Sequence, residues 1–252
     1  MNILIPMAGA GSRFKKDGYK ISKPLILVNQ NPMVVEATNH LPKSEKQIYI
    51  CRKEHLEDEK IDIEIKKHYP NSKFISIDYL TEGQASTCLL AKKEINNSEE
   101  LIIGACDNGI IWDEEKFIND KLQADCLVWT FRNNVTVVNK PQAYGWVEVN
   151  EENKAERVSV KVPISSKPIS DHAIVGSFWF KKGKYFVEAA EKMISKGRRI
   201  NNEFYVDECI NELIEIGLKV KVFEVDKYIC WGTPNDLRTY EYWQGFRKSQ
   251  NF

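Results

Sequence analysis

The sequence predicts an α/β fold in which a mainly parallel central sheet is flanked by helices, with a smaller antiparallel portion in the second half of the chain. In the first half, short runs of branched and aromatic residues alternate with stretches whose apolar residues recur at helical spacing, which is the pattern of consecutive βαβ units. After Asn133, strand-like runs follow one another across polar turns, as antiparallel strands do. The first strand runs directly into a glycine-containing loop. Because open α/β sheets bind ligands beyond the carboxyl ends of their strands, we expect the functional groups at that edge.

The first half contains five strand-like runs and three helix-patterned stretches. The strands are expected at residues 2–6, 47–51, 73–78, 101–106 and 125–131. Apolar residues at helical spacing predict helices at residues 54–67 and 84–95. A further helix continues through residues 36–40 and can begin at Pro32, because proline suits the first turn of a helix.

In the second half, the expected elements are antiparallel strands followed by helices. The strands lie at residues 144–149, 155–162 and 173–180, the helices at 185–195 and 206–216, a further strand at 219–225, and a last helix from 235 toward 246. No linker, repeat or low-complexity segment divides the chain. We therefore expect a single domain over residues 1–252, in which residues 133–252 build a second lobe onto the core formed by residues 1–132.

Charge and composition exclude several classes of protein. The 36 Lys and Arg residues are balanced by 36 Asp and Glu residues, so no excess of basic charge indicates nucleic acid or an anionic membrane as a partner. No apolar stretch reaches the length of a membrane span, and residues 1–8 lack a charged leader, so we expect them to form a buried first strand rather than a signal peptide. The six cysteines are scattered without CxxC spacing, away from the four histidines, which favours reduced thiols in a cytoplasmic protein.

The first strand ends in a loop of small residues followed at once by an arginine: Ala8, Gly9, Ala10, Gly11, Ser12 and Arg13. Gly9 and Gly11 allow the backbone to approach an anion closely, so that successive N–H groups can point at phosphate oxygens, and Arg13 adds a forked cation. The loop predicts a triphosphate site, with a tight strand-to-helix turn as the alternative. A dinucleotide-binding loop would need a third glycine in place of Phe14, and a Walker loop would need Gly-Lys-Ser/Thr, so both are weakened.

A Lys-Pro pair follows this loop. Pro24 restrains the backbone beside Lys23, so the lysine can reach back to bound phosphates, although an isolated Lys-Pro pair is usually only a turn. Together, the loop ending in Arg13 and the downstream Lys23-Pro24 resemble the signature of the sugar-phosphate nucleotidyltransferase family, which has a Rossmann-like fold. The resemblance implies an enzyme that transfers a nucleoside monophosphate from a nucleoside triphosphate to a small phosphorylated acceptor, releases pyrophosphate and uses Mg2+. It also implies that Arg13, Lys23 and Asp107 carry the catalysis.

Further motifs follow the family's order along nearly the whole chain. Those that resemble its base-binding turn and its metal-binding aspartate contain Gly83, Gln84, Ala85 and Asp107. Those that resemble its acceptor side contain Tyr144, Gly145, Gly176, Glu203 and Gly232-Thr233-Pro234. The resemblance thus implies a nucleotide-binding part at residues 1–132 and an acceptor-binding part at residues 133–252. Plainer interpretations of the single motifs are an Asx turn at Asp107, a solvated helix start at Gln84 or Glu203, and strand packing for Tyr144.

The chain departs from the family pattern at two positions. The family supplies a lysine for the acceptor phosphate within a Glu-Lys-Pro stretch, and the candidates here, Lys161 and Lys167, do not match it cleanly. The family also often places a second metal-binding aspartate two residues before Gly-Thr-Pro, where this chain has Cys230, and thiolate is a poor magnesium ligand. Either Asp226 takes the place of that aspartate, or Asp107, water and phosphates hold the ion alone.

The substrates follow from a closer resemblance. The glycine loop and Asn202-Glu203-Phe204 are similar to the capsule-associated branch of the family, which favours CTP as the nucleotide and phosphoglutamine as the acceptor, in modification of a capsule or surface polysaccharide. A sugar 1-phosphate with UTP, dTTP or CTP is the alternative. A glycosyltransferase of related fold would need an Asp-x-Asp pair, which Asp107-Asn108-Gly109 lacks, and a non-catalytic nucleotide-binding protein draws support only from Cys230. Four aromatic residues near the carboxyl end are expected to form either core or the face of a homodimer: Tyr240, Tyr242, Trp243 and Phe246.

Overall fold

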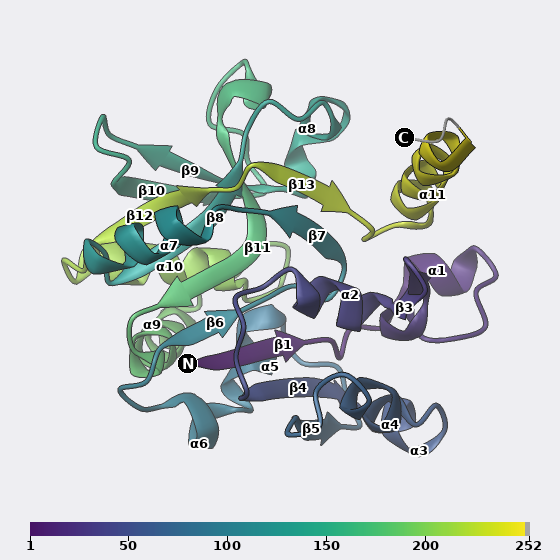
Figure 1. Ribbon diagram of the computed structural model, residues 1–252. Coiled ribbons are helices and arrows are strands. Elements are labelled where there is room, and N and C mark those ends of the chain that lie inside the picture. The colour runs from purple at the N-terminus through teal and green to yellow at the C-terminus, as the bar shows by residue number, and fades with distance from the viewer. Residues whose placement is uncertain (250–252) are drawn as a thin grey trace.

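The computed structural model describes residues 1–249 and is built on a nine-stranded, mainly parallel sheet (Figure 1). Its main strands, in spatial order, are β5 (Lys73–Ile77), β4 (Gln47–Arg52), β1 (Asn2–Pro6), β6 (Leu101–Ile103), β11 (His172–Phe180), β8 (Cys126–Phe131) and β12 (Val220–Glu224). Parallel pairing joins β5, β4, β1 and β6, and it also joins β8 to β12. Only β11 runs antiparallel to its neighbours β6 and β8. The predicted α/β class is confirmed, and β11 inserts a strand from the second half into the sheet of the first.

The remaining strands form short antiparallel pairs. β9 (Gly145–Val149) and β10 (Ala155–Val160) pair with each other, and β9 continues the sheet from β11. Two further pairs stand apart from the main sheet: β7 (Asn108–Ile111) with β13 (Lys227–Cys230), and β2 (Leu27–Val28) with β3 (Asn31–Pro32). Neither pair was predicted from the sequence, and the β7–β13 ribbon begins at the residue after Asp107.

The helices cover both faces of the sheet and extend past its end. They are α1 (Ser12–Lys16), α2 (Met33–Asn39), α3 (Lys53–Glu57), α4 (Ile61–Lys66), α5 (Gln84–Leu89), α6 (Lys92–Ile95), α7 (Glu114–Leu122), α8 (Thr136–Asn139), α9 (Gly183–Ser195), α10 (Val206–Glu215) and α11 (Pro234–Ser249). The helix expected at residues 54–67 is two helices, because Lys60 adopts a left-handed conformation with φ of 54°. The helix expected at 84–95 is also divided, since Leu90 and Ala91 form tighter bonds to the third residue before them.

The core lies on both faces of the parallel strands. Ile3, Leu4 and Ile5 are at most 1% exposed, as expected for a strand covered by helices on both sides. α9 and α10 pack on one face, α2 and α7 contribute to the other, and a third apolar cluster joins Phe14 to Trp231. Figure 1 shows α1 and α11 beyond the end toward which β1 and β13 point. Within the described residues, no helix is long and apolar enough to cross a membrane.

Candidate active site

The loop after β1 carries a run of backbone N–H groups that are not used by the fold. The N–H of Met7 still donates to Ile50 O at 2.8 Å, but within residues 1–249 none of the N–H groups of residues 8–13 donates to a protein acceptor. Gly11 turns the chain with φ of 59°, and its carbonyl accepts the N–H groups of Phe14 and Lys15. Because unpaired backbone donors are costly unless solvent or a ligand satisfies them, these N–H groups are left available to water or to an anion. Residues 8–13 are called the anion loop below, after the role expected from the sequence.

The loop opens into a cavity of about 510 Å³ that collects most of the residues singled out from the sequence. These are Ala8, Gly9, Ala10, Gly11, Ser12, Arg13, Lys23, Gly83, Gln84, Asp107 and Glu203. Ala105, Cys106 and Gly232 complete the wall beside Asp107. The cavity thus brings together four parts of the chain: the ends of β1 and β6, the start of α5 and the segment before α10. The topology of an open α/β sheet predicts such a meeting.

Lys23 and Asp107 form a direct ion pair inside this cavity, with their side chains 15% and 27% exposed. Burial alone would lower the pKa of Lys23, but the Asp107 carboxylate outweighs it and the pKa is raised above its ordinary value. Burial alone would likewise raise the pKa of Asp107, but Lys23, aided by Arg13, lowers it. Both groups are therefore charged at neutral pH. A Cβ atom added to Gly11 would lie 3.6 Å from the Cβ atom of Lys23. The lysine side chain therefore packs directly against the anion loop.

Asp107 offers a single carboxylate to a metal ion. The backbone holds it firmly, because Asp107 O accepts the N–H of Trp231 at 2.8 Å and the next residue, Asn108, donates its side-chain amide to Val175 O at 2.9 Å. No group of three His, Cys, Asp or Glu side chains in residues 1–249 could hold a metal. One carboxylate fits a magnesium ion only where substrate phosphates and water supply the other ligands, which is a common arrangement for this ion.

The structure does not bring Asp226 to this carboxylate, which corrects the expectation that it replaces the missing aspartate. In the β7–β13 ribbon, Cys230 faces Asn108 while Lys227 faces Ile111. Asp226 is exposed beyond the far end of that ribbon, where its N–H donates to Ile111 O. Asp226 lies four residues before Cys230 along extended chain, which corresponds to about 13 Å.

Cys230 lies close to Asp107, behind Gly232. A Cβ atom added to Gly232 would lie 3.0 Å from Asp107 Oδ2 and 3.3 Å from Cys230 Sγ. The carboxylate of Asp107 and the thiol of Cys230 therefore both lie next to Gly232. Burial, reinforced by Asp107 and Asp236, raises the pKa of Cys230 to about 12. The thiol is protonated and donates to Asp236 Oδ2 at 3.5 Å.

Asp236 is a residue beside the site that the sequence reasoning missed. Its side chain accepts a hydrogen bond from Thr233 Oγ1 at 2.6 Å, and its N–H donates to the same oxygen at 3.2 Å. This resembles a capping box at the start of α11, except that the Asp236 carboxylate accepts from the Thr233 hydroxyl rather than from the Thr233 N–H. The spacing Thr233-Pro-Asn-Asp236 is a recognisable signal for it, although only the fold shows that the box lies beside Cys230.

The turn expected to bind the base is packed against the segment before α10. Gly83 has φ of 125°, and a Cβ there would collide with the backbone of Phe204. Ala85 is buried behind the cavity wall, with its N–H donating to Phe204 O at 2.9 Å. Gln84 lies at the cavity surface, and in the described part of the chain its side chain forms no hydrogen bond, so its amide is free to meet a base edge. Thr87, also missed from the sequence, lines the cavity with Thr81, and their hydroxyls are 2.5 Å apart.

The residues expected to bind the acceptor lie in two places: some are at the wall of this cavity, and Tyr144 lines a second, adjoining cavity. Tyr144 lines an adjoining cavity of about 980 Å³, which shares Arg13 with the first and is walled by Tyr228, Cys230 and Trp243. Gly176 has φ of 93° and faces Ala105, since a Cβ added to this glycine would lie 3.6 Å from the alanine Cβ. Strand β11 therefore meets the cavity wall where the sequence places the acceptor motif.

Lys161 and Lys167 lie in different environments. Lys161 adopts the left-handed conformation with φ of 63°, donates to Ala143 O, and lies over the ring of Tyr205 at 5.4 Å. Burial lowers the pKa of Lys161, although Asp207 and Glu203 oppose the shift. Lys167 is exposed in the loop before the turn at Pro168–Ser170, where its N–H donates to Ser165 Oγ. Neither lysine lines either of the two cavities.

Asp207, in the first turn of α10, explains the glycine at position 145. A Cβ on Gly145 would collide with Asp207 Oδ2. Burial raises the pKa of Asp207, and Lys161 partly offsets that rise. No local pattern in the sequence points to this carboxylate, because its importance depends on a contact between residues far apart in the chain.

Comparisons with known proteins agree with this architecture. The chain resembles a nucleoside-diphosphate-sugar pyrophosphorylase from Vibrio cholerae RC9, with 19% identity, a TM-score of 0.77, and coverage of 94% of this chain and 98% of that one. It also resembles the inositol-1-phosphate CTP transferase from T. maritima (13% identity, TM-score 0.71, 98% and 96% covered) and HddC from Yersinia pseudotuberculosis (19% identity, TM-score 0.66, 97% and 99% covered). At these identities the likeness establishes the fold. No curated protein matches the sequence. A family model described as Nucleotidyl transferase matches residues 3–244, and the chain belongs to that family.

Proposed function

We propose that this nucleotidyltransferase transfers a cytidylyl group from CTP to a small phosphorylated acceptor, with phosphoglutamine favoured, and releases pyrophosphate. The observation that carries the proposal is the meeting of two features in one cavity: the unused N–H groups of residues 8–13 and the charged pair of Lys23 and Asp107. The first suits a triphosphate. The second provides a cation for the transferred phosphate and a carboxylate for a metal ion.

The reaction is an in-line displacement at the α-phosphorus. An oxygen of the acceptor phosphate forms the new bond to that phosphorus, the bond from phosphorus to the bridging oxygen breaks, and pyrophosphate leaves with the electron pair. The acceptor phosphate is already ionised, so no side chain has to remove a proton or act as a covalent nucleophile. Cys106 lines the cavity, but burial, with a contribution from Asp107, raises the pKa of its thiol to about 12, so it is not a thiolate nucleophile.

Each charged residue has a distinct part in this reaction. Arg13 neutralises the phosphates that leave, and Lys23 neutralises the transferred phosphate, so the chain stabilises charge where it develops. Asp107 would hold a magnesium ion, which would screen the two anionic substrates from each other. A phosphate that approaches Lys23 would compete with Asp107 for the lysine ammonium group. A carboxylate oxygen of Asp107 would then become available to the metal ion.

The substrate assignment rests on the resemblance of the sequence and on four side chains in or near the cavity. Gln84 presents a free amide to the base. Lys161 is the better candidate of the two lysines for the acceptor phosphate because it lies near Glu203, which lines the cavity, whereas Lys167 is exposed and lines neither cavity. Glu203 and Asp207 both lie near Lys161. Those carboxylates suit an amino or hydroxyl group on the acceptor. A sugar 1-phosphate with UTP, dTTP or CTP is the alternative, since hydroxyl groups would satisfy the same carboxylates.

Pyrophosphate release separates these assignments. The purified chain is incubated with magnesium and CTP, UTP, dTTP, ATP or GTP, each with phosphoglutamine, glucose 1-phosphate or unphosphorylated glutamine. Release with CTP and phosphoglutamine alone supports the proposal. Release only with a sugar phosphate assigns the chain to sugar activation, and nucleotide binding without release for any pair would mean a non-catalytic nucleotide-binding protein.

Assembly as a homodimer stays a prediction. Tyr242, Trp243 and Phe246 of α11 are 67%, 56% and 49% exposed, with neighbouring rings in contact, whereas Tyr240 packs against Trp231. Their exposure favours a surface role over a core role for three of the four aromatic residues.

A further inference from the structure

Arg199 joins two segments that both contribute to the cavity but lie far apart in the sequence. Its Nη2 donates to Glu82 Oε1 at 2.7 Å, and its Nη1 donates to Asn202 O at 3.3 Å. The guanidinium carbon also lies 4.1 Å from the centre of the Phe204 ring. One side chain therefore contacts both the turn expected to bind the base and the segment that carries Glu203.

The backbones of the two segments are joined at the same place. The N–H of Phe204 donates to Glu82 O at 2.7 Å, and the N–H of Ala85 donates to Phe204 O at 2.9 Å. Gly83 is needed between them, because a Cβ there would collide with Phe204. A shift of one segment relative to the other would strain these bonds, so they couple the positions of the two segments.

The segment that carries Glu203 is a tight hairpin. Ile200 and Glu203 exchange both backbone hydrogen bonds, at 2.9 and 3.0 Å. The two residues between them, Asn201 and Asn202, have φ of 50° and 64°, which is the conformation of a type I′ turn, and asparagine tolerates it. Glu203 thus leaves the turn with a fixed direction.

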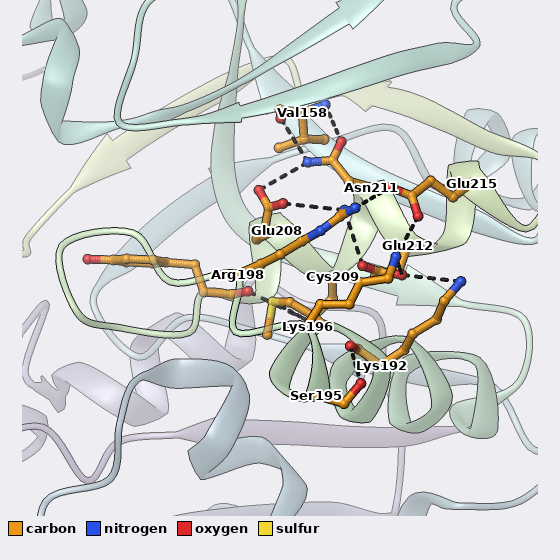
Figure 2. A network of polar contacts seen from close by, with 12 residues as sticks. Val158, Lys192, Ser195, Lys196, Arg198, Glu208, Cys209, Asn211, Glu212 and Glu215 are labelled. Atoms are coloured by element: carbon orange, nitrogen blue, oxygen red, sulfur yellow. Dashed lines mark hydrogen bonds and ion pairs between the residues drawn. The ribbon is translucent and has the colours of Figure 1, made fainter.

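The start of this hairpin is anchored on α10 through a buried carboxylate (Figure 2). Glu212 is fully buried and pairs with Lys196 at 2.8 Å and with Arg198 at 3.1 Å. Arg198 also pairs with Glu215 at 2.6 Å. The backbone just before Arg199 is therefore held in place by α10. Arg199 in turn contacts Glu82 and so links this anchored segment to the turn at residues 82–85.

We propose that Arg199 is a positioning residue that holds the base-binding turn and the Glu203 hairpin as one unit, so that nucleotide and acceptor are aligned by the same clamp. The inference rests on the proposed function, because it takes the turn at residues 82–85 as the base site. The Arg199–Glu82 pair is solvent-exposed, with side chains 36% and 63% accessible. Such pairs contribute little to global stability, so the pair's effect is expected in ligand binding rather than in folding.

Nucleotide binding by variants of the full chain tests this proposal. The probe is the α,β-methylene analogue of CTP with magnesium, titrated by calorimetry so that no turnover is needed. Arg199→Gln and Glu82→Gln should each weaken binding about fivefold or more. The double variant should be no weaker than either single variant, because both changes break one contact. Arg199→Lys should recover part of the affinity by restoring the charge.

A matched control comes from Arg132, which pairs with Glu224 at 2.7 Å and is 40% exposed, away from both cavities. Arg132→Gln should leave binding unchanged, and the melting temperatures of all variants should stay close to that of the wild type. Unchanged analogue binding in Arg199→Gln, or additive losses in the double variant, would overturn the clamp. If the wild-type chain binds no analogue of CTP, UTP, dTTP, ATP or GTP, the proposed function fails instead.

In turnover assays, with the acceptor identified by pyrophosphate release, the clamp predicts a second effect. Arg199→Gln should raise the KM values of nucleotide and acceptor together. A rise confined to the acceptor would show that Arg199 acts as an ordinary acceptor contact and would overturn the clamp.

Discussion

The ammonium group of Lys23 is bonded directly to Oδ2 of Asp107, although one residue follows the anion loop and the other lies beyond β6. Each group compensates the charge of the other before any substrate arrives. Under the proposed function, an incoming phosphate would pair with Lys23, and the Asp107 carboxylate would then be available to hold a metal ion. The Lys23–Asp107 pair therefore carries no net charge by itself.

Replacing Asp107 with asparagine tests its role at the metal. Asp107→Asn is nearly isosteric and leaves an oxygen for Lys23, so the fold should survive with a loss of about 1–2 kcal/mol in the free energy of unfolding. Turnover should fall roughly 100-fold or more, because the carboxylate charge is lost. Pyrophosphate release across a magnesium titration measures the effect. Asp226→Asn is the matched control and should retain activity. Near-normal turnover of Asp107→Asn at every magnesium concentration would remove this residue from the metal role.

Replacing Arg13 separates charge stabilisation from binding. Arg13→Ala should lower kcat by about 100-fold or more, because negative charge grows on the leaving pyrophosphate as the bond breaks. The dissociation constant of the CTP analogue should change by less than about tenfold. Arg238→Ala provides the comparison, since Arg238 pairs with Asp17 at 2.6 Å on the neighbouring surface. A raised KM for nucleotide with kcat intact would show that Arg13 binds ground state and transition state equally.

The strands and the clustering of the motifs could be predicted from the sequence because both depend on local pattern. β1 matches its predicted bounds, since an apolar run that ends in a glycine loop has one natural interpretation. The anion loop and Asp107 meet because parallel strands end at the same edge. The β7–β13 ribbon was missed because Asn108-Gly109 favours a turn as strongly as a strand, and its partner strand alternates between exposed and half-buried residues. The contacts of Asp207 with Gly145 and of Arg199 with Glu82 join distant segments, and no local signal encodes them.

The buried histidine of β11 predicts how stability depends on pH. His172 is 5% exposed and shares a hydrogen bond with Thr130. Burial, reinforced by Arg132, lowers the pKa of His172 to about 4. The pKa of this histidine in the unfolded chain is about 6.5. Between about pH 6.5 and pH 4, the imidazole is protonated in the unfolded chain but not in the folded chain, so the free energy of unfolding decreases as pH falls. The contribution is about 3 kcal/mol between pH 7 and pH 4.

Chemical denaturation at a series of pH values checks this effect. In His172→Asn, which keeps a partner for Thr130, the loss of unfolding free energy between pH 7 and pH 4 should be smaller by about 3 kcal/mol than in the wild type. His68 is exposed, so His68→Asn should follow the wild-type curve. Identical slopes for the wild type and His172→Asn would mean that His172 takes up its proton at an ordinary pKa.

Position 230, where the resemblance implies a second metal-binding aspartate, holds a cysteine in this chain. Cys230 Sγ and Asp107 Oδ2 both border Gly232, and Asp236 accepts a hydrogen bond from the thiol. Cys230→Asp would therefore place a third carboxylate between two existing ones. Without metal these charges repel, so the free energy of unfolding should fall. With magnesium the new carboxylate shares the cation with Asp107, so the apparent magnesium affinity should rise about tenfold, and the metal should restore the lost stability.

Melting temperatures with and without magnesium and CTP decide this prediction, and Cys230→Asn is the control. Asparagine has nearly the same shape as aspartate but carries no charge, so it should neither lose as much stability without metal nor gain as much with it. The half-buried position of Cys230 beside two carboxylates, rather than within the apolar cluster that holds Trp231, gives the acid room to face the cation. If magnesium and CTP relieve none of the destabilisation in Cys230→Asp, position 230 is structural, and the ion is held by Asp107 with water and substrate phosphates alone.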